Sequence, residues 1–346
     1  MTTATAPASI IDPPPAPLTP IPYHDPTTGE QLTRDGLQLV RNVGDSPAAT
    51  IRDGVADFIG GDSYAQSFGY QWNRTEAVRT QDTTLLERHR EEMDLRTGFN
   101  QMDLRGMTCL EVGAGLGDDT AYYLEQGIGE LHAIDLSASI FRAAKLIDDP
   151  RVRYARADVN KLPFAPESFD IVSCHRMMQH TPHPAATLAR VAKMVKPGGL
   201  LFAHSYHRSK YFERTSKYKY RWLTTRVPSP LLWNALAISA PVLRGVTAKL
   251  NRTKLFSGRL DGEEFARRWS PWVTQGHHMI KDVDRKTLLQ YETQVTFDAL
   301  TPKYDLPMYA DDFQDLIESM GFEIINIERR PWFPLWATAR RTRSQA

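Results

Sequence analysis

The stretch Leu110-Glu111-Val112-Gly113-Ala114-Gly115-Leu116-Gly117-Asp118-Asp119 decides the fold of this chain. The apolar run Thr108 to Val112 enters a turn with three glycines and continues into a helical pattern. Glycine has no Cβ and tolerates positive φ, so such a turn lets a ligand approach the backbone closely. The dinucleotide fingerprint requires a third small residue where this chain has Asp118. The turn therefore favours a nucleoside ligand without a pyrophosphate.

Strands and helices alternate from Gly106 to Gly199, which is typical of a doubly wound parallel sheet. The alternation stops after His207 and resumes at Asp311 with a helix and two further strands. The sequence therefore predicts an α/β fold with a Rossmann-like, doubly wound, seven-stranded, mostly parallel sheet. The expected strands are 108–112, 131–134, 152–157, 169–173, 200–204, 323–327 and 335–339.

Changes of pattern divide the chain into segments. The first twenty residues are rich in Ala, Thr and Pro, and they contain no Lys or Arg and no apolar run of signal-peptide length. We expect a disordered leader at 1–20, a small β-rich module at 21–61, a lid and helix at 62–105, the sheet domain at 106–207 and 310–346, and a helical insertion at 208–309 that caps the site.

Two cysteines, Cys109 and Cys174, fall in apolar runs and match no metal-ligand spacing. We interpret them as reduced core thiols, which fits a cytoplasmic protein without a metal site. The apolar stretch Leu231 to Leu243 is interrupted by Asn234 and Pro241, and we expect it to be too short to cross a bilayer.

Acidic residues follow two further strands. Asp135 comes about 20 residues after the glycine turn, where a carboxylate can bind two ribose hydroxyls. Asp158, followed by Val159, ends the next strand. The carboxyl ends of parallel strands meet at one edge of a sheet, so these groups predict a crevice for a nucleoside.

Several ordered motifs make this chain resemble the class I S-adenosylmethionine-dependent methyltransferases. They are Glu111 with the glycine turn, Asp135, the run Ala157 to Phe164, the run Ser168 to Val172, and Lys196-Pro197-Gly198-Gly199. The resemblance covers Gly106 to His207 closely and the C-terminal helix and strands more loosely. It implies an enzyme that binds S-adenosylmethionine, in which 106–207 and 310–346 form the methyltransferase core.

The resemblance also implies roles for individual residues. Gly113, Gly115 and Gly117 would lie against the methionine part of the cofactor, and Glu111 would orient the turn. Asp135 would hold the ribose. Asp158 would bond the adenine amino group, with Val159 beside it and Leu136 on the adenine face. His175 is a further expected cofactor contact.

The N-terminal module resembles the zinc-ribbon-like segment that precedes some bacterial methyltransferase domains, through Tyr23 to Glu30 and Ile51 to Val55. No cysteine stands at the metal-ligand positions, so a metal-free remnant is expected. The segment Ser67 to Trp72 resembles the lid of these enzymes, and Trp72 is expected to reach the acceptor; these side chains could instead pack in the core.

Histidines gather at two expected strand ends, His175 and His180 after one strand and His204 and His207 after the next. A hydroxyl acceptor needs a base, and histidine serves near neutral pH. We expect His180, His175 or His204 to act in catalysis. His180 could instead cap a turn, and the others could only line the pocket. The expected acceptor contacts are Tyr206, His207, Tyr304 and Trp72.

The acceptor is not decided by these residues. The net charge is +1, but Arg208 to Arg259 holds twelve Lys or Arg against the single acid Glu213. This run could be a solvated helix face, a site for an anionic or amphiphilic small molecule, or a nucleic-acid surface. The apolar neighbour, Leu231 to Leu243, favours a small molecule with a lipid-like or anionic part. The same motifs would suit a scaffold subunit that binds the cofactor without catalysis, whereas Asp118 disfavours a nicotinamide oxidoreductase.

Overall fold

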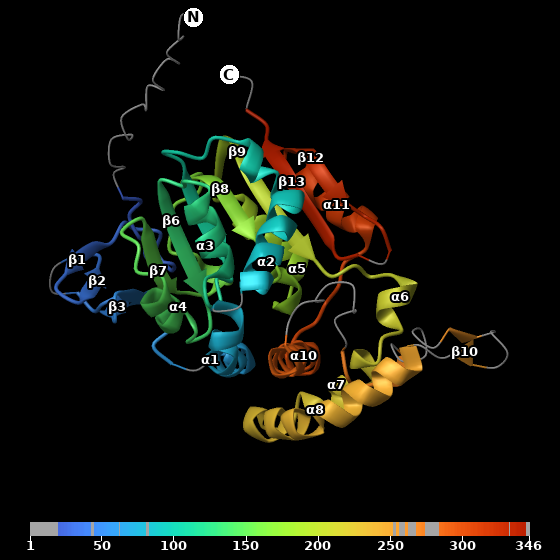
Figure 1. Ribbon diagram of the computed structural model, residues 1–346. Coiled ribbons are helices and arrows are strands. Elements are labelled where there is room, and N and C mark those ends of the chain that lie inside the picture. Colours follow the sequence, from blue (N-terminus) through green and yellow to red (C-terminus); the bar gives the residue numbers. More distant parts are fainter. Residues whose placement is uncertain are drawn as a thin grey trace, which may run out of the picture.

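A computed structural model describes residues 20–42, 45–61, 63–80, 83–251, 254–255, 260–261, 268–273, 284–331 and 333–343. The expected disordered leader therefore lies, except for Pro20, outside the described residues. Figure 1 shows a central twisted sheet with helices on both faces and a group of further helices at one end.

The central sheet confirms the α/β prediction. Its core strands lie in the order β7-β6-β5-β8-β9-β13-β12. The first five are parallel, whereas β13 runs antiparallel to both neighbours, β9 and β12. Their bounds are β5 Thr108–Val112, β6 Glu130–Asp135, β7 Val152–Arg156, β8 Phe169–Cys174, β9 Val195–Ser205, β12 Phe322–Glu328 and β13 Leu335–Arg341.

The N-terminal module adds four strands to this sheet, which makes it eleven-stranded rather than seven-stranded. The strands form an antiparallel meander, and β4 pairs in parallel with β7, with Val55 opposite Tyr154. The module has little core of its own, and it is stabilised by sharing the sheet's core through Leu39 and Ala56. The strands are β1 Thr33–Asp35, β2 Gln38–Val40, β3 Ala49–Arg52 and β4 Val55–Asp57.

Helices cover both faces of the sheet because successive residues of a strand point to opposite sides. On β5, Cys109 belongs to the core under α2 and α3, whereas Leu110 belongs to the core under α5 and α11. Cys109 and Cys174 are both buried and unpaired. The covering helices are α2 Thr83–Thr97, α3 Asp118–Glu125, α4 Ile140–Leu146, α5 Pro184–Ala192 and α11 Ala310–Ser319.

The helical insertion lies beyond the carboxyl ends of the parallel strands, beside α1 (Figure 1). Its helix α10 contacts α1, α7 and α8. The bounds of this group are α1 Gln66–Thr80, α6 Lys210–Glu213, α7 Lys217–Thr224, α8 Ser229–Asn251, β10 Lys254–Leu255, β11 Leu260–Asp261 and α10 Arg285–Leu300.

Helix α8 corrects one expectation from the sequence. Asn234 and Pro241 do not interrupt it, and the helix continues for 23 residues. Within the described residues it is the one helix long and apolar enough to cross a membrane, judged by length and composition alone. The predicted interruption and short length of this helix were wrong, because a proline removes one backbone donor without always ending a helix.

Candidate active site

A cavity of about 470 Å³ opens at the carboxyl ends of the parallel strands. Its lining residues follow β5, β6, β7, β8 and β9, and helices α1, α2 and α10 complete the wall. This is the position at which open α/β sheets bind ligands. The volume suits a ligand of nucleoside size together with a second small molecule.

The glycine turn forms one side of this cavity. Gly113 has φ +88°, and a Cβ there would stand 2.7 Å from the side chain of Met177. Gly115 has φ +58°, and a Cβ there would stand 3.4 Å from the Trp72 ring. Both glycines and Trp72 line the cavity. The turn therefore lies against Trp72 of α1 at the cavity wall, and the role of α1 as a lid stays a prediction.

Gly117 differs from the prediction. Among the described residues that line the cavity it does not appear. Its φ is +93°, and a Cβ there would stand 2.7 Å from the Ile147 side chain, behind the turn. Gly117 precedes the first residue of α3. Its conformation and packing shape the turn, but it does not face the expected ligand.

Asp135 stands at the end of β6 beside the turn. One carboxylate oxygen, Oδ2, accepts a hydrogen bond from the Gly115 backbone N–H at 2.9 Å. The other oxygen, Oδ1, accepts from the Ser137 N–H at 2.7 Å and the Ser137 hydroxyl at 2.6 Å. Burial raises the pKa of Asp135 in spite of these bonds. Each carboxylate oxygen has two acceptor positions, so Oδ2 retains one for a ligand hydroxyl.

Of the residues expected around an adenine ring, Leu136 and Val159 line the cavity and Asp158 does not. The Asp158 carboxylate accepts from the N–H of Asn160 at 2.8 Å and from its side-chain amide at 2.9 Å. It thereby caps the short helix η2, Val159–Lys161. The sequence Asp-Val-Asn is itself a capping signal, because Asp readily accepts from the N–H two residues on.

Glu111 lies in the floor of the cavity and is buried. Its Oε2 accepts a hydrogen bond from the Thr120 hydroxyl at 2.5 Å. Burial and the neighbouring Asp119 hold the pKa of Glu111 well above its usual range. This contact links β5 to the first turn of α3 and so fixes both ends of the glycine turn.

A cluster of charged side chains that the sequence analysis missed joins α2 to the cavity. Asp119 lies 2.7 Å from His175 Nδ1 and 2.8 Å from His89 Nε2. Glu92 forms ion pairs with Arg96 and Arg176. Burial opposes its ionisation, but both arginines outweigh burial and lower the pKa of Glu92 to about 2. All five side chains, with His175, line the cavity.

Both ring nitrogens of His175 are engaged in this cluster. Nδ1 faces Asp119, and Nε2 lies 2.8 Å from Arg96 Nη1. Arginine only donates, so the partners assign the proton to Nδ1 and the lone pair at Nε2 to Arg96. Burial lowers the pKa of His175 to about 4. Neither ring nitrogen of His175 is therefore left to take a proton from a methyl acceptor. The arrangement favours the other expected role of His175, a contact with the cofactor.

His180, in the short helix η3 Met178–His180, is differently placed. Its Nδ1 lies 3.0 Å from the Tyr304 carbonyl oxygen, which can only accept. The proton is therefore assigned to Nδ1 and the lone pair to Nε2, and His180 lines the cavity. Burial lowers the pKa of His180, while Asp298 and Asp305 act in the opposite direction.

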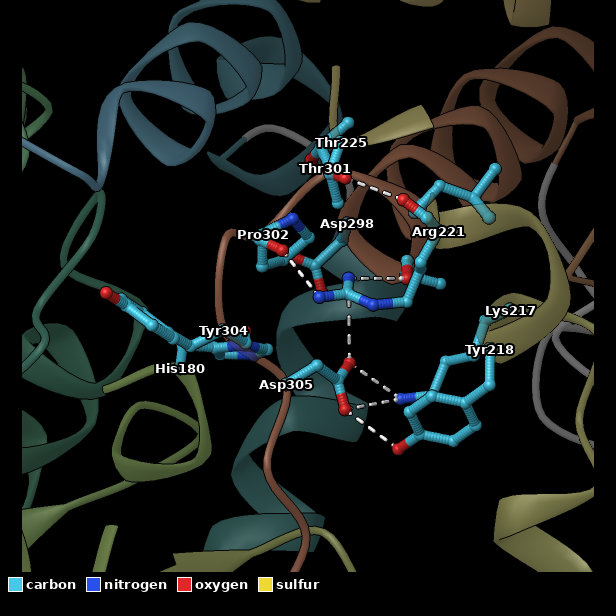
Figure 2. A network of polar contacts seen from close by, with 12 residues as sticks. His180, Lys217, Tyr218, Arg221, Thr225, Asp298, Thr301, Pro302, Tyr304 and Asp305 are labelled. Carbon is cyan, nitrogen blue, oxygen red and sulfur yellow. Dashed lines mark hydrogen bonds and ion pairs between the residues drawn. The ribbon is translucent and has the colours of Figure 1, made fainter. Parts of the chain in front are cut away.

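The segment that holds His180 is anchored by a buried ion-pair network (Figure 2). Asp305 accepts from Lys217 Nζ at 2.9 and 3.1 Å and from the Tyr218 hydroxyl at 2.9 Å. Arg221 donates to the carbonyl of Pro302 at 2.6 Å. Because Tyr304 lies between these anchors, the network fixes the carbonyl that orients the His180 ring.

These contacts also explain part of the basic run. Lys217 is buried against Asp305, Lys219 donates to the Arg268 carbonyl at 2.8 Å, and Arg221 donates to backbone carbonyls. Among the described residues none of the three lines the cavity. They hold the insertion together and are not placed to bind an anionic acceptor.

The remaining predicted site residues divide into two groups. His204, Tyr206 and Trp72 line the cavity, whereas His207 and Tyr304 are not among its described lining residues. His207 meets the backbone at Arg330, with Nδ1 3.1 Å from that carbonyl oxygen. Tyr304 contributes its carbonyl to His180, and its ring packs edge-on against Tyr64.

Two buried polar atoms at the cavity have no partner among the described residues. They are Nδ1 of His204 and Oε1 of Gln294. Both residues line the cavity, and Gln294 comes from α10, which the sequence analysis did not associate with the site. Buried polar groups are normally hydrogen-bonded, so these two atoms are suited to form hydrogen bonds with a bound molecule.

A comparison with protein families identifies the domain that carries this cavity. Residues 110–203 match the family model described as a methyltransferase domain. The chain contains a class I methyltransferase domain. The match begins on β5 and ends on β9, so it includes the glycine turn, Asp135, His175 and His180.

Curated relatives that match part of this chain are also methyltransferases. A ubiquinone biosynthesis O-methyltransferase from Neisseria meningitidis is 36% identical over 107 residues, which is 29% of this chain and 44% of the relative. Phosphoethanolamine N-methyltransferase 2 from Caenorhabditis elegans is 31% identical over 118 residues, 33% of this chain and 27% of the relative. The chain thus spans less than half the length of these relatives.

Among solved structures, an S-adenosylmethionine-dependent methyltransferase from Mesorhizobium loti superimposes with a TM-score of 0.40 at 17% identity. The superposition covers 69% of this chain and 93% of the Mesorhizobium loti chain. Among the described residues no group of His, Cys, Asp or Glu side chains is arranged to hold a metal ion, and the zinc-ribbon likeness of the N-terminal module stays a prediction.

The cofactor that the methyltransferase domain implies is S-adenosylmethionine, and the cavity fits it. Gly113 and Gly115 line the cavity without a side chain, and Asp135 Oδ2 retains an acceptor position for a ribose hydroxyl. The charges of Glu92, Arg96 and Arg176 offer partners for the amino and carboxylate groups of its methionine part.

Proposed function

We propose that this protein transfers the methyl group of S-adenosylmethionine to a hydroxyl group of a small molecule, with His180 as the general base. The observation that carries this proposal is the hydrogen bond from His180 Nδ1 to the Tyr304 carbonyl, 3.0 Å long. It leaves the lone pair on Nε2 of a residue that lines the cavity, whereas both nitrogens of His175 are engaged.

When bound, S-adenosylmethionine supplies a methyl group activated by the sulfonium. His180 accepts the hydroxyl proton at Nε2 while the acceptor oxygen forms its bond to the methyl carbon and the sulfur–methyl bond breaks. The products are a methyl ether and S-adenosylhomocysteine, and the proton resides on His180. The nearby carboxylates of Asp298 and Asp305 stabilise the resulting imidazolium.

The acceptor side of the cavity supports a small molecule of mixed character. Phe68, Tyr206 and Val295 provide apolar surface, and Gln294 and Asp298 provide polar atoms. The names of several relatives, ubiquinone biosynthesis O-methyltransferases, support oxygen as the acceptor atom. An N-methyltransferase is among the relatives at similar identity, so the choice of oxygen depends on the histidine.

The test is formation of S-adenosylhomocysteine by mass spectrometry across phenolic, carboxylic, amine and isoprenoid acceptors. For a phenolic acceptor that reacts, His180→Asn should lower kcat by roughly 10²–10⁴-fold, which is the usual contribution of a general base. His207→Asn is the matched control, because that histidine is buried outside the cavity lining. An active His180→Asn enzyme, or cofactor binding without turnover of any acceptor, would refute the proposal.

A further inference from the structure

Helix α8 exposes a broad apolar face on the outside of the insertion. The exposed fractions are 63% for Leu231, 81% for Ile238, 68% for Val242 and 53% for Val246. These residues are separated by seven, four and four positions, which are close to whole turns at 3.6 residues per turn. They therefore lie along one side of the helix.

Most of the other exposed residues on this helix are also apolar or small. They are Pro230, Ala235, Ala237, Pro241 and Gly245, and Asn234 and Lys249 are the polar ones. Single exposed apolar side chains are common on protein surfaces, but a continuous apolar face of several helical turns marks an interaction site.

The opposite side of α8 is buried against the rest of the protein. Trp233 and Leu236 pack with Phe297 and Leu300 of α10, and Tyr70 of α1 joins this cluster. Arg244 forms an ion pair with the buried Glu292 at 3.1 Å. A helix that spans a bilayer would have to give up this packing. The structure instead fits a helix that lies along a surface with one face outward.

The charges around α8 indicate what kind of surface its apolar face would contact. Exposed basic residues stand on α7, before α8 and near its end, at Lys219, Arg226 and Lys249. From residue 208 to residue 251 the only acid is Glu213, and it is paired with Arg208 at 2.8 Å. Exposed tryptophans flank the helix in sequence, Trp222 at 68% and Trp269 at 54% exposure. Apolar side chains flanked by basic residues and tryptophan match the composition of helices that bind anionic membranes.

We propose that α8 docks this protein on an anionic lipid bilayer, in the plane of the membrane, with its apolar face among the acyl chains. This inference is independent of the proposed methyl transfer. Since α10 carries Tyr291, Gln294 and Asp298 to the cavity and packs directly on α8, docking would bring the acceptor side of the cavity close to the membrane.

The test is flotation of the full chain with lipid vesicles. The vesicles are made of phosphatidylcholine alone or with about one third phosphatidylglycerol. The variant Ile238→Glu/Val242→Glu places two charges on the outer face, at positions exposed enough to leave folding intact. Leu95→Glu is the matched control, because Leu95 is a helical leucine with 72% exposure on α2.

The wild type and Leu95→Glu should float with the anionic vesicles and much less with neutral ones. The double variant should lose at least about tenfold in vesicle partitioning. The proposal is overturned if the wild type does not bind anionic vesicles, or if the double variant binds them equally well. It is also overturned if light scattering shows a dimer that the double variant dissociates while no lipid binding occurs. Catalytic activity enters none of these measurements, so they remain decisive if the proposed function fails.

Discussion

Removing Lys217 should destabilise the protein and slow catalysis together, because Asp305 anchors the segment that orients His180. The Lys217 and Asp305 side chains are 10% and 1% exposed, and Nζ lies 2.9 Å from Oδ2. Breaking a buried pair by removing one partner costs roughly 3–5 kcal/mol. In Lys217→Met, the Tyr218 hydroxyl still donates to Asp305 and Arg221 lies 3.9 Å away. We therefore expect the lower end of that range, about 3 kcal/mol.

The assay is urea unfolding followed by circular dichroism, with kcat measured on the folded variant. Lys219→Met is the control, because its exposed side chain meets a carbonyl and the Trp269 ring, and it should cost less than about 1 kcal/mol. The double variant Lys217→Met/Asp305→Leu should recover part of the stability, since the unpaired Asp305 carboxylate is gone and Arg221 keeps its hydrogen bonds to the carbonyls of Ala299 and Pro302. Equal costs for Lys217→Met and Lys219→Met, or no recovery in the double variant, would refute this reasoning.

The site leads to three further predictions. Burial lowers the pKa of His180 below 6.5, so kcat for a hydroxyl acceptor should stay constant from neutral to mildly alkaline pH and fall in acid as Nε2 is protonated. A pH profile of kcat that is unchanged in His180→Asn would contradict this. Burial lowers the pKa of His175 from 6.5 to about 4, so the unfolded chain binds this proton more readily, and the free energy of unfolding should fall as the pH drops from 6.5 towards 4. Urea midpoints at several pH values check this, and a midpoint that rises in that window would contradict it. Gly117→Ala should cost about 2 kcal/mol through its positive φ and the contact with Ile147, while the folded variant binds S-adenosylhomocysteine normally; weaker binding at unchanged stability would place Gly117 against the ligand after all.

The features that the sequence predicted well are those encoded locally. Each core strand is a short apolar run next to a turn. The glycines at 113 and 115 indicate a turn whose backbone a ligand can approach closely. The position of Asp135 beside the glycine turn could be predicted from its spacing in the sequence. One helical crossover joins the two adjacent parallel strands, so the strand ends that carry the turn and Asp135 lie side by side. Alternation of strand and helix patterns also indicated the α/β class.

The features that the sequence did not reveal depend on contacts between distant segments or on side-chain direction. Glu92 and Arg96 reach the cavity from α2 through partners far along the chain, and an i, i+4 pair on a helix gives no sign of that. Asp158 ends a strand, yet its carboxylate turns back to cap η2. Two neighbouring histidines, His175 and His180, look alike in sequence and differ only through their partners.

Calorimetric titration of S-adenosylhomocysteine into the wild type and Gly115→Val examines cofactor binding at the glycine turn without any need to know the acceptor. We expect one binding site in the wild type and loss of measurable binding in the variant, because a branched side chain at φ +58° would fill the space beneath Trp72. No heat with the wild type, or equal affinity in the folded variant, would contradict the claim that this cavity binds the cofactor.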